Sequence, residues 1–320
     1  MLEPMTLPLQ RLKTYALAER PSLVSREGFA RAVAPPAGAV RALFDSMPDL
    51  LGARSLRRLA GAILAARTAR APVLLGLGAH VFKVGLTPLL VDLLERGFVQ
   101  GIALNGAGAI HDVELALIGA TSEDVASALQ DGSFGMARDT AEFLNGAVKR
   151  GAAEGLGFGE AVARAIDAAK APHRELSLLW NGLRRGVPAT VHVTLGADIV
   201  HMHPSADGAA IGAASLADFR RFAELVCGLE GGVYVNVGSA VTLPEVFLKA
   251  LAIARNLGSR VESFTTANLD QLPHYRPRVN VLERPAGGKS FDLRGHHEIL
   301  LPLLRWLLID PVPAALEPPR

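Results

Sequence analysis

Three strand-to-helix turns built from small residues carry the most informative chemistry of the sequence. They are LLGLGAHVFKVG (74–85), GIALNGAGAIHDVELAL (101–117) and VNVGSAVT (235–242). In such turns glycine lets the backbone approach a pyrophosphate, whose charge then meets the free N–H groups of a helix N-terminus. The first two lack a full G-x-G-x-x-G, so ordinary turns of a parallel sheet, where glycine serves tight packing, are the alternative. We predict dinucleotide binding at these turns.

A histidine-rich segment, HVTLGADIVHMHPSADG (192–208), offers a second kind of chemistry. We expect a strand near 198–202, on which His201 and His203 would point to the same face. With His192 nearby, such a pair could ligate a metal or form a polar cluster at an active site. No third ligand lies at tight spacing, which favours the polar cluster, and we expect no metal.

Two further motifs are less decisive. GGKS (287–290) is not the end of a phosphate-binding loop, because Glu283 stands where that motif needs a glycine. HHE (296–298) opens the last apolar helix and either caps that helix or points at a cleft.

The glycine turns resemble the consecutive strand–helix units of deoxyhypusine synthase and its relatives. The second turn, NGAGAIHDVELAL, is also similar to the NAD-binding LOR/SDH-type domain. The resemblance continues through GGVYVNVGSAVT (231–242), FTTANLD (264–270) and HHEILLPLL (296–304), and it covers roughly residues 70–305 with gaps. It implies a Rossmann-like fold, NAD as cofactor and an amine such as a polyamine as substrate. It also implies a homotetramer of paired dimers, with active sites at the dimer interfaces.

The resemblance further implies which residues contact NAD. These are Gly76, Gly78, His80, Asn105, Gly106, His111, Asp112, Asp198, Gly238, Ser239 and Thr266. His111 departs from the family, which has a glutamate there; an imidazole can bond a ribose hydroxyl but does not supply the same charge. Asp112 has a second interpretation, as an acid that satisfies free N–H groups at a helix start.

The catalytic lysine of deoxyhypusine synthases follows a tryptophan in W-G-K, and this sequence contains no W-G-K. Lys289 is the first candidate for an imine-forming lysine, because it follows the expected last strand in a Gly-Gly loop; a solvated loop lysine is the alternative. Lys83, in the first turn, better suits contact with a phosphate. A nucleophilic lysine needs a lowered pKa, from burial or a neighbouring cation. Without such a lysine, His201, His203 or Asp270 would act as the base.

These observations predict an NAD-dependent enzyme of the transferase type that acts on an amine, by aminoalkyl transfer or by deamination through an imine. One alternative is a non-catalytic NAD-binding regulatory protein, which the missing W-G-K favours. A weaker alternative is a metal-dependent hydrolase built on His192, His201 and His203.

Alternating strand and helix patterns must position these groups. Strands are expected near 73–77, 100–104, 190–195, 198–202, 232–237, 260–265 and 278–282. Helices are expected near 84–95, 111–119, 137–150, 158–169, 173–185, 215–228, 242–256 and 297–308. This alternation predicts an α/β fold with a doubly wound, mostly parallel sheet. We expect residues 1–70 to form a helical segment packed on the core and 71–310 a single NAD-binding domain. A helical insertion is expected near 120–186, and a flexible tail over 311–320.

Bulk composition narrows the class of protein further. Half of the 320 residues are hydrophobic, enough for a sizeable core, and the net charge of +2 gives no basis for nucleic-acid binding. The lone Cys227 excludes an internal disulfide framework and suits a reducing compartment. No signal peptide and no apolar run of about 18 residues is present, so we expect a cytoplasmic protein without a membrane span. The apolar stretch 299–310 suits a buried interface, and a dimer or tetramer is expected.

Overall fold

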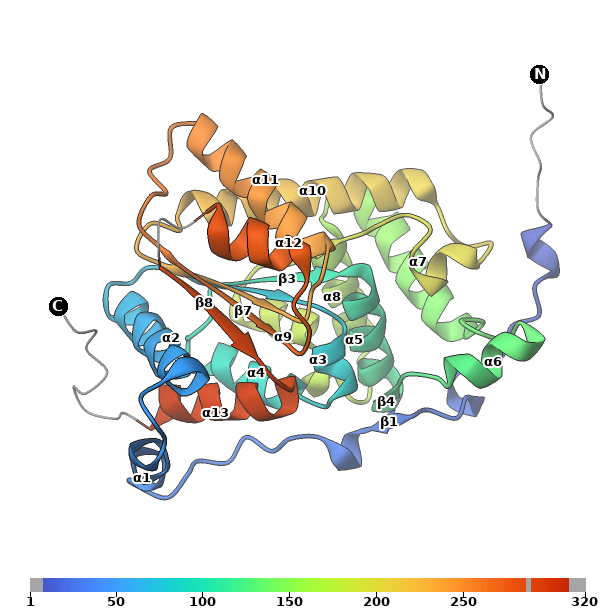
Figure 1. The fold of residues 1–320 in the computed structure, drawn as a ribbon. Helices are drawn as coiled ribbons and strands as arrows, with labels where there is room; N and C mark the ends of the chain where they lie inside the picture. Colours follow the sequence, from blue (N-terminus) through green and yellow to red (C-terminus); the bar gives the residue numbers. More distant parts are fainter. Residues whose placement is uncertain (1–7, 286–288, 311–320) are drawn as a thin grey trace.

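The computed structural model of the chain describes residues 8–285 and 289–310 (Figure 1). At its centre lies a six-stranded sheet, parallel throughout, in the order β5-β3-β2-β6-β7-β8. The strands are β2 (Val73–Leu77), β3 (Gly101–Asn105), β5 (Ala189–His192), β6 (Val233–Val237), β7 (Thr265–Asp270) and β8 (Ser290–Arg294). The expected α/β fold with a doubly wound parallel sheet is therefore confirmed.

The order of the strands reverses between β2 and β6. From β2 the chain continues through β3 to β5 at one edge, and it then returns to β6 and proceeds through β7 to β8 at the other edge. Every residue of β2 and β6 is buried, as central strands covered on both faces require. In open parallel sheets ligands bind beyond the carboxyl ends of the strands at such a reversal.

Helices cover both faces of the sheet (Figure 1). One face is covered by α10 (Gly208–Cys227) and α11 (Thr242–Asn256), and there Tyr234 stacks on Phe247 with 3.8 Å between ring centroids. The other face carries α2 (Leu51–Thr68), α4 (Thr87–Glu95), α5 (Gly106–Ile118), α8 (Phe158–Ala168), α9 (Leu178–Arg185) and α13 (His297–Ile309).

The sequence of α2 shows why these helices pack as they do. Leu56, Leu59, Ala60 and Ile63 recur at the spacing of one helix face, and all four are buried in the core. The polar residues between them face outward, so this helix is held mainly by its apolar face.

The first part of the chain is not the helical segment that we expected. Residues 8–38 are extended, with three short 3-10 turns, and α-helix starts only at α1 (Ala39–Ser46) and α2. Within this part, β1 (Val24–Ser25) pairs antiparallel with β4 (Ala120–Thr121). We call residues 15–25 the N-terminal strap. Residues 1–7 and the expected tail 311–320 lie outside the described residues.

Two of the expected strands are displaced or absent. The segment 198–202 forms a 3-10 helix, η5 (Ile199–Met202), and the strand expected at 260–265 lies five residues later as β7. β7 reads TTANLD and is buried, and Asn236 Nδ2 on β6 donates to Asn268 Oδ1 at 2.8 Å. Buried polar side chains, of which Asn236 and Asn268 bond to each other, thus replace the apolar pattern on which the prediction relied.

The end of the sheet differs in the same way. The apolar run 278–282, expected to be the last strand, belongs to a π-helix, η6 (Arg278–Glu283). The edge strand is β8, which was not expected. The other expected strands and helices overlap observed ones.

The region 120–186 is mainly helical after β4. It contains α6 (Val125–Asp131), α7 (Arg138–Ala153), α8, η4 (Arg174–Leu176) and α9. Among the residues that the structure describes, no helix is long and apolar enough to cross a membrane.

Candidate functional site at the carboxyl edge of the sheet

The loops after β2 and β6 meet where the strand order reverses. Gly78 N–H donates to the Val237 carbonyl at 2.8 Å, and a Cβ on Gly78 would lie 2.0 Å from the carbonyl oxygen of Gly238. Gly238 has a φ of +65°, which favours glycine. Both predicted glycines therefore lie at the reversal, where each permits the close approach of the two backbones.

A histidine pair lies beside the crossing, the point where the loops after β2 and β6 meet. The rings of His80, in α3 (His80–Lys83), and His297 lie 5.2 Å apart. His297 Nε2 donates to the Leu269 carbonyl at 3.0 Å, and its buried Nδ1 has no partner among the described residues. Burial, followed by the nearby His297, lowers the pKa of His80. The HHE motif thus contributes its second histidine to this contact, and it provides no side-chain cap for α13.

Two further predicted residues lie beside this pair. Asp270 is buried at the carboxyl end of β7, and its Oδ1 accepts from the Gln271 N–H at 2.8 Å. Ser239 Oγ accepts from the Leu243 N–H at 3.2 Å and so starts α11. Gly78, His80, Gly238, Ser239 and Asp270 therefore gather at one place, although the sequence separates them by nearly two hundred residues.

A cavity of about 200 Å³ lies next to the crossing, beyond the carboxyl ends of β3 and β5. Its lining includes Lys83, Ile110, His111, Glu114, Asp198 and Ile199. Lys83 is exposed, and no ion pair or hydrogen bond of its ammonium group is found within residues 8–285 and 289–310. The cavity therefore combines one ammonium group with several acceptors.

The start of α5 forms one wall of this cavity. Asn105 Oδ1 caps the helix by accepting from the Gly108 N–H at 2.9 Å. A Cβ on Gly106 would lie 1.9 Å from Asp198 Oδ2, so only glycine lets that carboxylate reach the first turn of α5. Burial raises the pKa of Asp198 to about 6. The structure thus brings Asn105, Gly106, His111 and Asp198 into one neighbourhood.

A buried charged network forms another wall of the cavity, and sequence reasoning missed it. Arg20 of the N-terminal strap donates to both oxygens of Glu114 at 2.9 and 2.8 Å. Glu123 accepts from the Tyr15 hydroxyl at 3.0 Å. An ionisable Glu114 within the apolar second half of α5, VELALI, was the available signal, whereas Arg20 lies in a stretch without periodicity.

Asp112 is not available to a cofactor. It is fully buried, and its carboxylate accepts from the Ser177 hydroxyl and from the N–H groups of Leu178 and Leu179 at the start of α9. Burial raises its pKa to about 7. The interpretation of Asp112 as an acid that satisfies free N–H groups therefore fits, but it serves a different helix from its own.

Two other predicted cofactor contacts are buried inside the strands of the sheet. Gly76 is inside β2, where a Cβ would lie 2.3 Å from the Tyr234 hydroxyl, so glycine serves packing there. Thr266 is the second residue of β7 and is fully buried. Asp270 is four positions further along the chain, about 13 Å along a strand. The misplaced strand is the reason that Thr266 was assigned to the site.

Lys289 lies at the opposite edge of the sheet. It immediately precedes β8, its side chain is exposed, and its carbonyl accepts from the Thr266 N–H at 3.0 Å. The prediction that it follows the last strand and reaches the cleft is wrong, because that strand begins after Lys289. The two glycines before it lie outside the described residues.

His201 and His203 do not share a strand face. His201 Nδ1 accepts from the N–H groups of Gly196 and Asp198 within its own loop, at 3.2 and 3.3 Å. His203 is buried and donates from Nε2 to the Gly135 carbonyl at 2.8 Å. The 3-10 helix η5 separates the directions of the two rings, so the expected joint polar cluster does not form.

His192 is also occupied elsewhere. Its Nε2 lies 3.0 Å from Thr190 Oγ1, and burial lowers its pKa to about 3. Across the described ranges, no three His, Cys, Asp or Glu side chains converge as a metal site would need. The geometry gives the metal-dependent hydrolase no support.

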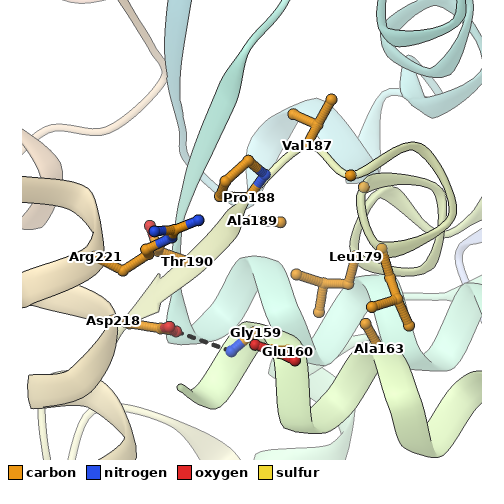
Figure 2. Close-up of a pocket in the computed structure, with 13 residues that line it drawn as sticks. Gly159, Glu160, Ala163, Leu179, Val187, Pro188, Ala189, Thr190, Asp218 and Arg221 are labelled. Atoms are coloured by element: carbon orange, nitrogen blue, oxygen red, sulfur yellow. Dashed lines mark hydrogen bonds between the residues drawn. The ribbon is translucent and has the colours of Figure 1, made fainter. Parts of the chain in front are cut away.

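A second cavity, of about 220 Å³, lies at the amino end of β5 (Figure 2). Its buried acid is Asp218, whose Oδ2 accepts from Gly159 N–H at 2.8 Å and from Val191 N–H at 2.7 Å. These bonds join the start of α8 to the edge strand. This cavity is remote from the reversal, and its carboxylate is engaged by backbone, so it is not our candidate site.

The chain was compared with known families and proteins. No protein-family model matches it. No curated protein matches it either.

Solved structures share its fold. A LOR/SDH protein from Methanococcus maripaludis S2 superposes with a TM-score of 0.53 and 14% identity, covering 87% of this chain and 74% of that one. AgrE, in a ternary complex with ornithine and NAD+, gives 0.51 and 15%, covering 79% of this chain and 32% of AgrE. A deoxyhypusine synthase from Entamoeba histolytica gives 0.48 and 9%, covering 92% and 95%.

The present chain therefore spans about a third of the length of AgrE. Identities this low establish architecture rather than activity. The resemblance to LOR/SDH-type proteins inferred from the glycine turns is confirmed at the level of the fold.

Proposed function

We propose that the chain is an NAD-dependent enzyme that acts on an amine, by aminoalkyl transfer or by deamination through an imine. The main supporting observation is the reversal of strand order between β2 and β6. There the Gly78 and Gly238 backbones touch beside a cavity that is lined by an ammonium group and a carboxylate. Parallel sheets of this order bind dinucleotides at that position.

The residues around the reversal fit NAD. Lys83 offers an exposed, unengaged ammonium for a phosphate, and Asp198 and His111 offer acceptors for ribose hydroxyls. The orphaned Nδ1 of His297 offers one more acceptor at the crossing. Such an atom is costly to bury without a partner, so a ligand that supplies a donor would be favoured there.

When bound, NAD would supply the hydride acceptor that turns an amine-bearing carbon into an imine. The chain would supply positioning and charge. With a pKa of about 6, Asp198 is mostly ionised at neutral pH and attracts a substrate ammonium. Of the two lysines considered from the sequence, only Lys83 lines the cavity. An imine at Lys83 is the alternative to its contact with a phosphate, because one amine cannot serve both at once.

The structural neighbours support the ligand class. AgrE was crystallised with ornithine and NAD+, and its matching region has the fold of this chain. This support extends to the class of cofactor and of substrate.

Calorimetry with NAD and with NADP tests the cofactor. We expect heat of binding and a rise in melting temperature, because a ligand at about 100 times its Kd stabilises the native state by about 2.7 kcal/mol. If saturating concentrations of NAD and of NADP give no heat of binding and no thermal shift, the proposal is refuted.

A panel of amines with NAD, followed at the NADH absorbance, tests turnover. Borohydride trapping during turnover then separates the routes: an adduct at Lys83 supports aminoalkyl transfer, and turnover without an adduct supports deamination. NAD binding without turnover of any amine would favour the non-catalytic regulatory alternative.

Assembly into a dimer or tetramer is a separate proposal. The apolar residues Leu301, Leu304, Leu307 and Leu308 of α13 are buried inside the chain itself, so α13 no longer argues for an interface. The proposal now rests on the resemblance alone, and light scattering that shows a monomer at micromolar concentration would overturn it.

A further inference from the structure

A chain of hydrogen bonds runs from the N-terminal strap to the cavity. Arg20 holds Glu114 through two bonds, at 2.9 and 2.8 Å. Thr121 Oγ1 donates to Glu114 Oε2, and the same hydroxyl lies 2.6 Å from Nδ1 of His111. The last member of the chain, His111, lines the cavity.

The order of donors along this chain sets the tautomer of His111. A hydroxyl has one proton, and the Glu114 carboxylate is a stronger acceptor than a neutral imidazole nitrogen. The Thr121 proton therefore goes to Glu114, and the hydroxyl oxygen accepts from His111. His111 must then carry its proton on Nδ1, which leaves Nε2 with a free lone pair.

That lone pair has no partner in the part of the chain that the structure describes. The His111 side chain is 12% exposed, and Nε2 is not among the buried atoms left without a partner, so it is reachable from the cavity. Burial lowers the pKa of His111 to about 4, outweighing the nearby Glu114, so the ring is neutral near pH 7. Nε2 of His111 is thus a free hydrogen-bond acceptor that faces the cavity.

We propose that His111 is the hydrogen-bond acceptor that this site offers its ligand, and that Thr121, Glu114 and Arg20 are positioning residues that hold its Nε2 unprotonated. The ligand group at Nε2 must be a donor: a ribose hydroxyl of NAD or an N–H of the amine. The inference rests on the proposed function for those two ligands, whereas the tautomer is a property of the free protein.

The N-terminal strap holds both Glu114 and Thr121 in place. Arg20 secures Glu114, and the pairing of Val24 with Thr121 in β1 and β4 fixes the backbone that carries the hydroxyl. Thr140 Oγ1 adds a further bond to Glu114 Oε1 at 3.2 Å. The carboxylate is therefore held by four donors and cannot turn away from Thr121 without leaving the others unpaired.

NMR of the full chain labelled with 15N-histidine tests the tautomer directly. We expect His111, identified by the signals lost in His111→Gln, to show a protonated Nδ1 and an unprotonated Nε2. Thr121→Val keeps the shape and removes the hydroxyl, so we expect a population protonated on Nε2. Thr121→Ser restores the hydroxyl and should restore the single tautomer. A wild-type His111 protonated on Nε2 would overturn the proposal.

Binding experiments test the acceptor role and identify its ligand. We expect Thr121→Val to weaken one ligand about fivefold and His111→Phe about tenfold, the size of one lost hydrogen bond, while Thr121→Ser stays near wild type. Thr68→Val, at the exposed end of α2, is the matched control.

Two measurements distinguish NAD from the amine as the ligand at Nε2 of His111. A weaker Kd for NAD by calorimetry assigns the ribose hydroxyl, and a higher KM for the amine with an unchanged NAD Kd assigns the amine. If neither constant changes and neither NAD nor the amine panel moves the Nε2 signal, the acceptor role is overturned. Absence of NAD binding in the wild type would refute the proposed function, and the tautomer in the free protein would still decide whether the positioning chain exists.

Discussion

Asp198, which is half-buried, and Asp218, which is buried, lie near opposite ends of β5, and both carboxylates pack against a glycine. A Cβ on Gly106 would lie 1.9 Å from Asp198 Oδ2, and a Cβ on Gly157 would lie 1.9 Å from Asp218 Oδ1. Each carboxylate therefore closes on a glycine at the start of a helix. Burial raises the pKa of Asp198 to about 6 and that of Asp218 to about 7.

Their hydrogen-bond donors distinguish them. Asp218 binds backbone N–H groups of two separate elements, Gly159 in α8 and Val191 in β5. Asp198 caps only its own short helix η5 and otherwise borders the cavity with Lys83 and His111. Burial and a raised pKa are therefore common to a structural acid and a candidate functional acid, and the origin of the donors tells the two apart.

The two carboxylates should differ most clearly in how much the free energy of unfolding falls when each is removed. Asp218→Ala leaves two buried N–H groups without acceptors, so we expect the free energy of unfolding to fall by about 3 kcal/mol. Asp198→Ala removes one local cap and should cost about 1 kcal/mol. Urea denaturation followed by circular dichroism measures both. Equal losses would mean that the two acids are equally structural.

The pH dependence of the free energy of unfolding should reflect the titration of Asp218. Its pKa is raised on folding, so the folded state keeps a proton that the unfolded state loses between about pH 4 and 7. Stability from this group is present below that window and is lost as pH rises through it, by up to about 1.4 kcal/mol per pH unit. In Asp218→Asn this slope should flatten across the window, and in Asp198→Asn only below about pH 6. Unfolding free energies at several pH values would show an unchanged slope if the assignment is wrong.

The two glycines should differ in what their substitution damages. In Gly106→Ala the new methyl group displaces the Asp198 carboxylate, and we expect NAD to bind about tenfold more weakly, a loss of about 1.4 kcal/mol. In Gly157→Ala the displaced group is Asp218, so stability falls while the NAD affinity of the folded protein is retained. Gly52→Ala, in open space on α2, serves as the control. The same NAD affinity in all three variants would contradict the placement of the cofactor.

The smallest expected effect compares lysines at the two edges of the sheet. Lys83→Gln should weaken NAD binding about fivefold, and the loss should shrink as salt is added, because an exposed charge is screened. Lys289→Gln should change nothing, since that side chain lies at the amino edge. Calorimetry at low and high salt decides. A larger effect from Lys289 would restore the first assignment of the catalytic lysine.

The parts of the fold that follow apolar periodicity were predictable. β2 and β6 are apolar runs that end in glycine, and Gly78 and Gly238 mark where the backbones meet. The carboxyl edge, and with it the position of the glycine turns after β2, β3 and β6, followed from that pattern. Gly76 shows the limit of the reasoning, because a glycine required for packing against Tyr234 has the same signature as one that approaches a ligand.

The errors arose where hydrogen bonds rather than apolar contacts hold the chain. β7 is buried through polar residues, and shifting it by five positions moved Thr266 to the wrong end of the sheet. Lys289 was misplaced because the edge strand follows it rather than precedes it. The pairing of Arg20 with Glu114 could not be predicted, since the two residues lie far apart in the chain and Arg20 follows no pattern.

The long separation within that pair has a consequence for synthesis. Arg20 leaves the ribosome 94 residues before Glu114, and so the strap is exposed without its partner while the first two strands and their helices are made. Closing so large a loop is slow compared with forming a local helix. The cavity is therefore completed late, after α5 and β4 are in place. A chaperone that binds extended nascent segments would meet the strap before the protein has any use for it.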